Sequence, residues 1–202
     1  MTTLKKTGLK MTKLKWFALL PLALIVATAH AADLGLAASK ITVHVEKSGL
    51  FAAFAHNHVI AAPLASGQLD LDKRTIELTF RAQEMKVLDP DASASERSTI
   101  EGNMKGDEVL DAARFPEIKF VSTSVDPAPG EAAAPAHYLV HGNLTLHGVT
   151  RPVGMSVSFS AGHYTGKVIL KQTDFGITPI KIGGGAIRVK DPIEIDFEIV
   201  LK

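Results

Sequence analysis

The sequence predicts an all-β fold, an antiparallel β-barrel of about eight strands with one helical insertion. Apolar and polar residues alternate over most of residues 41–201, and short turns separate the alternating runs. Since successive side chains of a strand point to opposite faces, each run is a strand with one apolar face. Several such strands joined by short turns are typical of an antiparallel sandwich or barrel.

The clearest alternation lies in residues 138–159, which predict an amphipathic β-hairpin. The connection between its two strands contains Gly148 and Pro152, the usual residues of a tight turn. The apolar faces of the two strands are formed by Tyr138, Val140, Gly142, Leu144 and Leu146, and by Val153, Met155, Val157 and Phe159.

Other segments show the same pattern less completely, and the last strand shows it best. Further strands are expected in residues 41–46, 51–60, 67–72, 75–81, 117–125 and 163–172. In the last strand the acidic residues Glu194, Asp196 and Glu198 oppose an apolar series. We therefore expect this strand to expose the three acids and to bury Ile195, Phe197 and Ile199.

Residues 91–113 interrupt the strand pattern and predict the helical insertion. Ser93 or Ser95 is suited to cap the start of a helix, and Ile100 and Met104 would lie on one helical face. Gly106 is expected to end the helix.

The N-terminal 31 residues have the organisation of a secretory signal peptide. Five lysines precede the apolar run of residues 16–27, and Ala29-His30-Ala31 has small residues at both recognition positions for cleavage. The start can be Met1 or Met11, because a signal peptide from Met11 has a more ordinary length. We expect one domain in residues 32–202, secreted into the periplasm.

Charge and cysteine content narrow the functional classes. Removing the five lysines of the signal peptide from the 22 Lys and Arg residues leaves 17 basic against 21 acidic residues. A mildly acidic chain gives no support to nucleic-acid binding. The chain has no cysteine, so the core must supply the stability without disulfides.

Four segments, in order along the chain, resemble the YceI-like polyisoprenoid-binding family of bacterial envelope proteins. They are Ser48–Pro63, Arg97–Phe120, the hairpin segment LTLHGVTRPV (144–153), and Thr173–Lys202 with its Asp174-Phe175-Gly176-Ile177 loop. One difference is that many relatives carry R-D-x-H-L in the helix, where this chain has Arg97-Ser98-Thr99-Ile100. A role of that helical histidine therefore does not transfer.

The resemblance implies a lipocalin-like barrel that carries an amphiphilic isoprenoid, a polyprenyl lipid or a quinone, without catalysis and without a cofactor. Its partners would be this or another long-chain lipid and, transiently, a membrane surface. The apolar faces predict these cavity contacts: Phe54, Phe80, Phe120, Leu144, Leu146, Val157, Phe159 and Phe197. The alternative for the same residues is an ordinary packed core.

Two histidines complete the candidate ligand-binding site. His56 and His58 share a strand face with Phe54 and are expected to point inward. They can be structural residues with hydrogen-bond partners, contacts of a lipid head group, or metal ligands. The match of His58 to the second-strand block of the family favours head-group contact for this residue.

Two other functions fit parts of the pattern. An outer-membrane barrel also alternates, with apolar residues outside, but only 6% of the residues are aromatic, too few for two aromatic girdles. A metal-dependent enzyme or metal-binding protein would use His56 and His58. No serine or carboxylate pair has neighbours that would activate it for catalysis.

Overall fold

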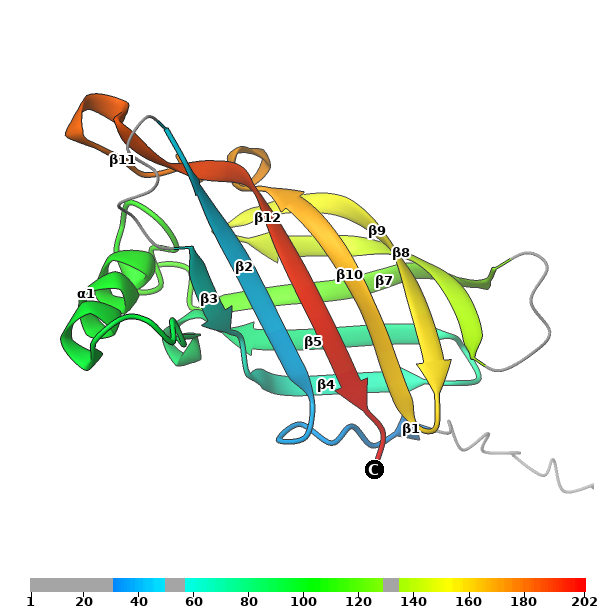
Figure 1. Ribbon diagram of the computed structural model, residues 1–202. Helices are drawn as coiled ribbons and strands as arrows, with labels where there is room; N and C mark the ends of the chain where they lie inside the picture. Colours follow the sequence, from blue (N-terminus) through cyan, green and yellow to red (C-terminus); the bar gives the residue numbers. More distant parts are fainter. Residues whose placement is uncertain (1–30, 50–56, 129–134) are drawn as a thin grey trace, which may run out of the picture.

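The computed structural model describes residues 31–49, 57–128 and 135–202, which form a curled antiparallel sheet with one α-helix at its end (Figure 1). In chain order the elements are β1 (Ala31–Ala32), β2 (Lys40–Ser48), β3 (His58–Ala61), β4 (Leu64–Asp70), β5 (Thr75–Arg81), η2 (Ala82–Glu84), β6 (Lys86–Val87), α1 (Ala94–Lys105), β7 (Glu117–Pro127), β8 (Ala136–Leu146), β9 (Val149–Ser160), β10 (His163–Lys171), η3 (Gln172–Phe175), β11 (Lys181–Ile182), η4 (Gly183–Gly185) and β12 (Ile187–Val200).

The sheet follows the order β1-β4-β5-β7-β8-β9-β10-β12-β2-β3-β6, with β11 paired to β12. Only Ala62 and Pro63 separate β3 from β4, so one nearly continuous segment pairs first with β2 and then with β5. Pro63 stands at this corner, where no ladder needs its missing N–H. This bent segment joins the two sides of the sheet, and with it the described residues contain eight long strands. The predicted antiparallel barrel is thereby confirmed.

The predicted hairpin is formed by β8 and β9, paired over their whole common length from Ala136↔Phe159 to Leu146↔Val149. Its turn consists of His147 and Gly148, both in the left-handed region with φ of 51° and 73°. Positive φ at both central residues is the type I′ geometry, whose twist matches that of the flanking strands. A side chain at Gly148 would meet the Phe115 ring at 2.4 Å, so glycine is needed there.

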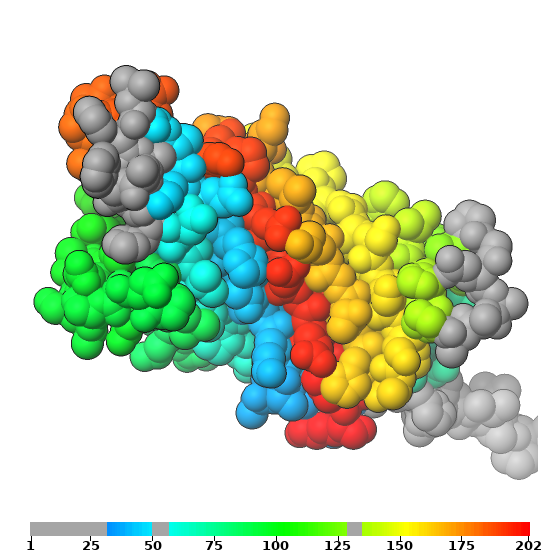
Figure 2. Space-filling model, viewed as in Figure 1, coloured from blue at the N-terminus to red at the C-terminus, as the bar shows by residue number. Residues whose placement is uncertain are grey.

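The helical insertion also agrees with the prediction. The hydroxyl of Ser93 accepts a hydrogen bond from the backbone N–H of Glu96, and the Glu96 carboxylate accepts one from the backbone N–H of Ser93. This reciprocal capping box begins α1, and Gly106 caps its end. The helix lies as a separate bulge at one end of the barrel (Figures 1 and 2). None of the described helices is both long and apolar enough to cross a membrane.

The outer face of the barrel carries ion pairs. On neighbouring strands, Lys167 binds Glu194 at 2.5 Å and Asp196 at 3.4 Å. The side chains of Glu194, Asp196 and Glu198 are 39%, 45% and 38% exposed, as the alternation of the last strand predicts. Of the three residues predicted to be buried, Ile199 is buried, whereas Ile195 and Phe197 are only half-buried. A charged outer face with an apolar inner face is the reverse of the outer-membrane alternative.

Candidate ligand-binding site

The inner face of the barrel is apolar and encloses a cavity of about 230 Å³. Close-packed protein interiors have few voids larger than a water molecule, so this space is more than imperfect packing. The cavity runs along the barrel from residues near β1 to residues beside α1. Its walls include Leu34, Ile41, Val43, Val45, Ile60, Leu69, Ile76, Leu78, Phe80, Met85, Met104, Val109, Leu110, Ile118, Phe120, Val140, Leu144, Leu146, Val153, Met155, Val157, Tyr164, Val168, Leu170, Gln172, Ile177, Ile193, Ile195, Phe197 and Ile199.

Several wall residues in the middle of the barrel keep part of their exposure. Inward-facing Val153, Met155, Val168, Ile195 and Phe197 are only half-buried, although each lines the cavity. A side chain of a filled core would have lost nearly all its exposure. These residues border open space while they also pack against the core, and their contact with a ligand stays a prediction.

Two phenylalanines leave the central space free because glycines lie beneath their rings. A Cβ atom on Gly142 would meet the Phe120 ring at 2.5 Å, and one on Gly166 would meet the Phe197 ring at 2.4 Å. Each ring thus lies against the bare backbone of a neighbouring strand. The recesses at Gly142 and Gly166 hold two of the predicted phenylalanine contacts, Phe120 and Phe197, close to the wall.

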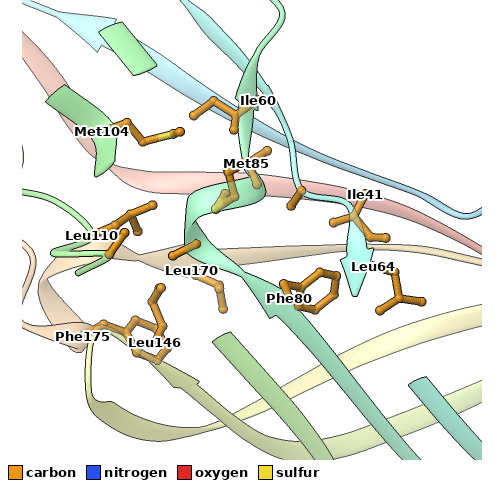
Figure 3. Packing of buried hydrophobic residues seen from close by; sticks show 14 of the residues in the cluster. Ile41, Ile60, Leu64, Phe80, Met85, Met104, Leu110, Leu146, Leu170 and Phe175 are labelled. Carbon is orange, nitrogen blue, oxygen red and sulfur yellow. The ribbon is translucent and has the colours of Figure 1, made fainter. Parts of the chain in front are cut away.

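The end of the barrel beside α1, here called the helix end, is densely packed. Phe175 is 1% exposed, Ile177 4%, and Met104 and Leu110 7% each. Figure 3 shows Met104, Met85 and Ile60 close together, with Phe175 and Leu146 packed on the other side of Leu110. The apolar side chains in these contacts close the cavity at the helix end.

Short polar links attach the closing segments to the barrel. The Gln172 side-chain amide donates to the carbonyl oxygen of Lys190 at 2.8 Å. Asp191 accepts hydrogen bonds from the Thr173 backbone at 2.9 Å and from its hydroxyl at 2.7 Å. The backbone hydrogen bond from Thr173 is the main cause that holds the pKa of Asp191 below its ordinary value. These links fix η3, which carries Phe175, onto β12.

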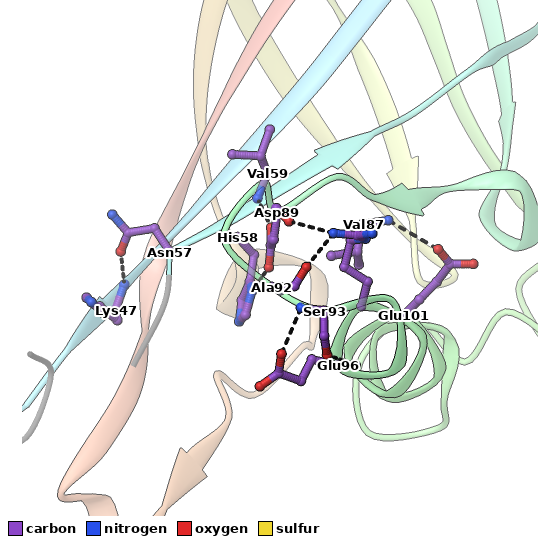
Figure 4. A network of polar contacts seen from close by, with 11 residues as sticks. Lys47, Asn57, His58, Val59, Val87, Asp89, Ala92, Ser93, Glu96 and Glu101 are labelled. Carbon is purple, nitrogen blue, oxygen red and sulfur yellow. Dashed lines mark hydrogen bonds and ion pairs between the residues drawn. The ribbon is translucent and has the colours of Figure 1, made fainter. Parts of the chain in front are cut away.

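His58 lies at the helix end, on the same face of β3 as the cavity-lining Ile60, but its imidazole does not line the cavity. Its Nδ1 is 2.6 Å from a carboxylate oxygen of Asp89, whose other oxygen accepts the backbone N–H of Val59 at 2.7 Å (Figure 4). Arg97 donates to the carbonyl oxygens of Asp89 and Ala92. This set of contacts, the His58–Asp89 lock, ties the loop before α1 to β3.

Asp89 is the residue that the sequence did not reveal. It is 2% exposed, whereas a carboxylate is rarely buried unless it is paired. In the sequence it stands in Leu88-Asp89-Pro90-Asp91, where both acids fit an exposed turn. Asp89 is 31 positions from His58, so no sequence pattern around His58 indicates that the two side chains are hydrogen-bonded.

The predicted contacts divide into three groups. Those that line the cavity are Phe80, Phe120, Leu144, Leu146, Val157 and Phe197. Phe159 and His58 do not line it, and the Phe159 ring packs on Tyr164 with centroids 4.4 Å apart. The ligand contact expected for these two side chains therefore stays a prediction without support from the cavity lining. Phe54 and His56 lie outside the described residues, and the described residues hold no group of three His, Cys, Asp or Glu that could bind a metal ion.

Comparisons with known proteins agree with this architecture. A profile of the YceI-like domain matches residues 32–201. A UPF0312 protein of Pseudomonas savastanoi pv. phaseolicola is 37% identical over 103 residues, which cover 46% of this chain and 49% of the relative. A UPF0312 protein of Pseudomonas fluorescens is 50% identical over 50 residues, 25% of each chain. The alignments thus span about half, or less, of the curated relatives.

Two solved structures share the fold. Burkholderia cenocepacia BcnA superposes with a TM-score of 0.61 at 20% identity, covering 84% of this chain and 100% of that protein. A polyisoprenoid binding domain from Saccharophagus degradans, implicated in plant cell wall breakdown, has a TM-score of 0.58 at 14% identity and covers 87% and 99%. At these identities the likeness concerns the fold alone.

Proposed function

Because the chain belongs to the YceI-like domain family, we propose that its barrel binds the apolar chain of an amphiphilic isoprenoid, a polyprenyl lipid or a quinone. The proposed role is non-catalytic carriage of this lipid in the periplasm, after removal of residues 1–31 as a signal peptide. The observation that carries the proposal is the hollow apolar cavity inside the barrel. The structural relative from Saccharophagus degradans, described as a polyisoprenoid binding domain, supports the ligand class.

The size of the cavity limits what it accepts. Pockets for small organic ligands usually have volumes of about 300–1,000 Å³. At about 230 Å³ the cavity holds a slender chain better than a broad ring system. Half-buried wall residues such as Met155 and Ile195 have room to move aside, so a longer chain can widen the space.

Transfer of the chain from water is favourable by about 0.8 kcal/mol for each buried methylene group. A bilayer solvates the same chain equally well, so this energy does not by itself draw the lipid out of a membrane. The shape of the cavity and the contacts of the head group must supply the difference. We therefore expect the protein to prefer a lipid with a distinct head over a bare hydrocarbon.

The direct test is mass spectrometry of an organic extract from protein purified out of its native periplasm. We expect an isoprenoid in a ratio near one per chain. The blocking variant is Ile195→Trp, which places a large side chain in the cavity, and its matched control is Ile169→Trp. Ile169 lies on the adjacent strand β10, faces outward and is 64% exposed.

Loss of the lipid from Ile195→Trp, with retention by Ile169→Trp, supports carriage inside the barrel. A folded wild-type protein without isoprenoid, or equal lipid in both variants, contradicts it. The intact mass of the exported protein tests the leader independently, since we expect a chain that begins at Ala32. Retention of Met1 or Met11 on exported protein would contradict the cleavage.

A further inference from the structure

A second pocket, of about 340 Å³, lies at the end of the barrel opposite α1, here called the tyrosine end. It is formed where the β4–β5 turn, the end of β7 and the beginnings of β8 and β10 meet. Tyr164 lines both this pocket and the apolar cavity. Leu69 lines both spaces as well, so the second pocket and the cavity adjoin at these two side chains.

The walls of this pocket carry several hydrogen-bond donors, whereas the described residues that line the cavity are apolar apart from Tyr164 and Gln172. Tyr138 and Tyr164 stand on β8 and β10, on either side of β9, and both line the pocket. Burial, and secondarily the neighbouring Tyr138, raises the pKa of Tyr164 above its ordinary value of 10.0. The phenol thus stays neutral at physiological pH and keeps a proton to donate.

The acid in this pocket is already neutralised. Asp70 binds the ammonium group of Lys73 at 3.0 Å and accepts the backbone N–H of Lys73 at 2.9 Å. The backbone hydrogen bond is the main cause that lowers the pKa of Asp70, followed by the side-chain hydrogen bond from Lys73. The remaining polar side chain, His137, shares a hydrogen bond of 3.0 Å with Ser158.

Arg74 is the charged residue of the pocket whose side chain has no partner among the described residues. It lines the pocket and its guanidinium has no hydrogen bond or ion pair with other described residues. It also holds a left-handed backbone with φ of 52°, where glycine or asparagine is favoured. Arg74 is exposed, and it shares the lining of this pocket with two phenol groups, next to the apolar cavity.

We propose that the pocket at the tyrosine end binds an anionic head group, a phosphate or carboxylate, of the lipid whose chain fills the cavity. This inference rests on the proposed function. Arg74 supplies the positive charge, and its guanidinium can donate two parallel N–H hydrogen bonds to the oxygens of the anion. The phenol hydroxyls of Tyr138 and Tyr164 donate further hydrogen bonds to these oxygens. The chain passes Tyr164 and extends toward the helix end, so the head remains at the tyrosine end.

The test compares three probes by native mass spectrometry with the mature protein: geranylgeranyl phosphate, geranylgeraniol and inorganic phosphate. The key variant is Arg74→Gly, which removes the guanidinium and relieves the left-handed backbone, so the fold is not at risk from this change. The matched control is Arg81→Gln, which removes the same charge from the other end of β5. We expect wild type and Arg81→Gln to bind geranylgeranyl phosphate about tenfold more tightly than geranylgeraniol.

In Arg74→Gly we expect this preference to vanish while the affinity for geranylgeraniol stays unchanged. The wild-type preference should also weaken as salt is added. Inorganic phosphate in equal amount should not displace geranylgeranyl phosphate, since a free phosphate lacks the chain. Displacement by inorganic phosphate, or an unchanged preference in Arg74→Gly, would overturn the head-group assignment while leaving the proposed function intact. Failure of wild type to bind either isoprenoid would overturn the proposed function and this inference with it.

Discussion

The two ends of the barrel are built differently. At the helix end, Phe175, Ile177, Met104 and Leu110 are almost fully buried, and the His58–Asp89 lock fastens the adjoining loop. At the tyrosine end, Tyr138 and Tyr164 are half-buried and end in phenol hydroxyls, beside apolar residues such as the buried Leu69. We propose that the helix end mainly stabilises the fold and that the tyrosine end supplies contacts for the ligand.

The largest expected effect is the loss of stability on removing a tightly packed phenylalanine ring, compared with a ring that lines the cavity. Phe175→Ala should lower the free energy of unfolding by about 3–5 kcal/mol, because the ring is 1% exposed and leaves a void. Phe197→Ala should cost less stability and more affinity for the isoprenoid, since its half-buried ring faces a space that already exists. Urea denaturation and binding of geranylgeraniol, measured on both variants, check this contrast. Equal stability losses with no change in binding would mean that Phe197 does not face a ligand cavity.

An intermediate effect is expected at the His58–Asp89 lock. Asp89→Ala leaves the Val59 N–H and the His58 imidazole without their buried acceptor, which should cost about 1–3 kcal/mol of stability. His58→Phe should also destabilise the protein but leave its preference for geranylgeranyl phosphate over geranylgeraniol unchanged. A lost preference in His58→Phe would restore the contact between this histidine and the head group that the sequence suggested.

The smallest effects should appear in the pH dependence, with opposite signs at the two ends. The pKa of Asp191 is lowered by its hydrogen bonds from Thr173, so its contribution is present above the ordinary value of 3.8 and is lost as the pH falls through the folded-state value. The pKa of Tyr164 is raised by burial, so stability falls once the pH passes 10.0 and the unfolded chain ionises first. The difference in urea midpoint between wild type and Asp191→Asn should shrink in acid. A wild-type protein whose alkaline loss of stability matches that of Tyr164→Phe would contradict the second assignment.

The sequence revealed those features that depend on the alternation along a single strand. Phe120, Leu144 and Val157 line the cavity because the face of a strand residue follows from its parity. The start of α1 was also predicted from nearby residues, since Ser93 was one of the two expected capping residues.

Contacts between segments that are far apart in the chain could not be predicted from the sequence. Phe159 has the right parity but stands at the end of β9, where its ring meets Tyr164 instead of the cavity. The buried partner of His58 comes from the loop after β6, and Arg74 reaches the second pocket only because β4 and β5 pair beside β7. These contacts depend on which strands pair with one another. The alternation of residues along a single strand does not reveal its pairing partner.

The most direct test of the account is the orientation of the lipid in the barrel. A prenyl phosphate with a photoreactive group beside its phosphate, and a second with the group at the far end of its chain, are cross-linked separately and mapped by peptide mass spectrometry. We expect the first probe to label peptides with Tyr138 and Tyr164, and the second to label peptides with Met85, Met104 and Leu110. The reverse pattern, or both probes on the same peptides of the outer face, would contradict it.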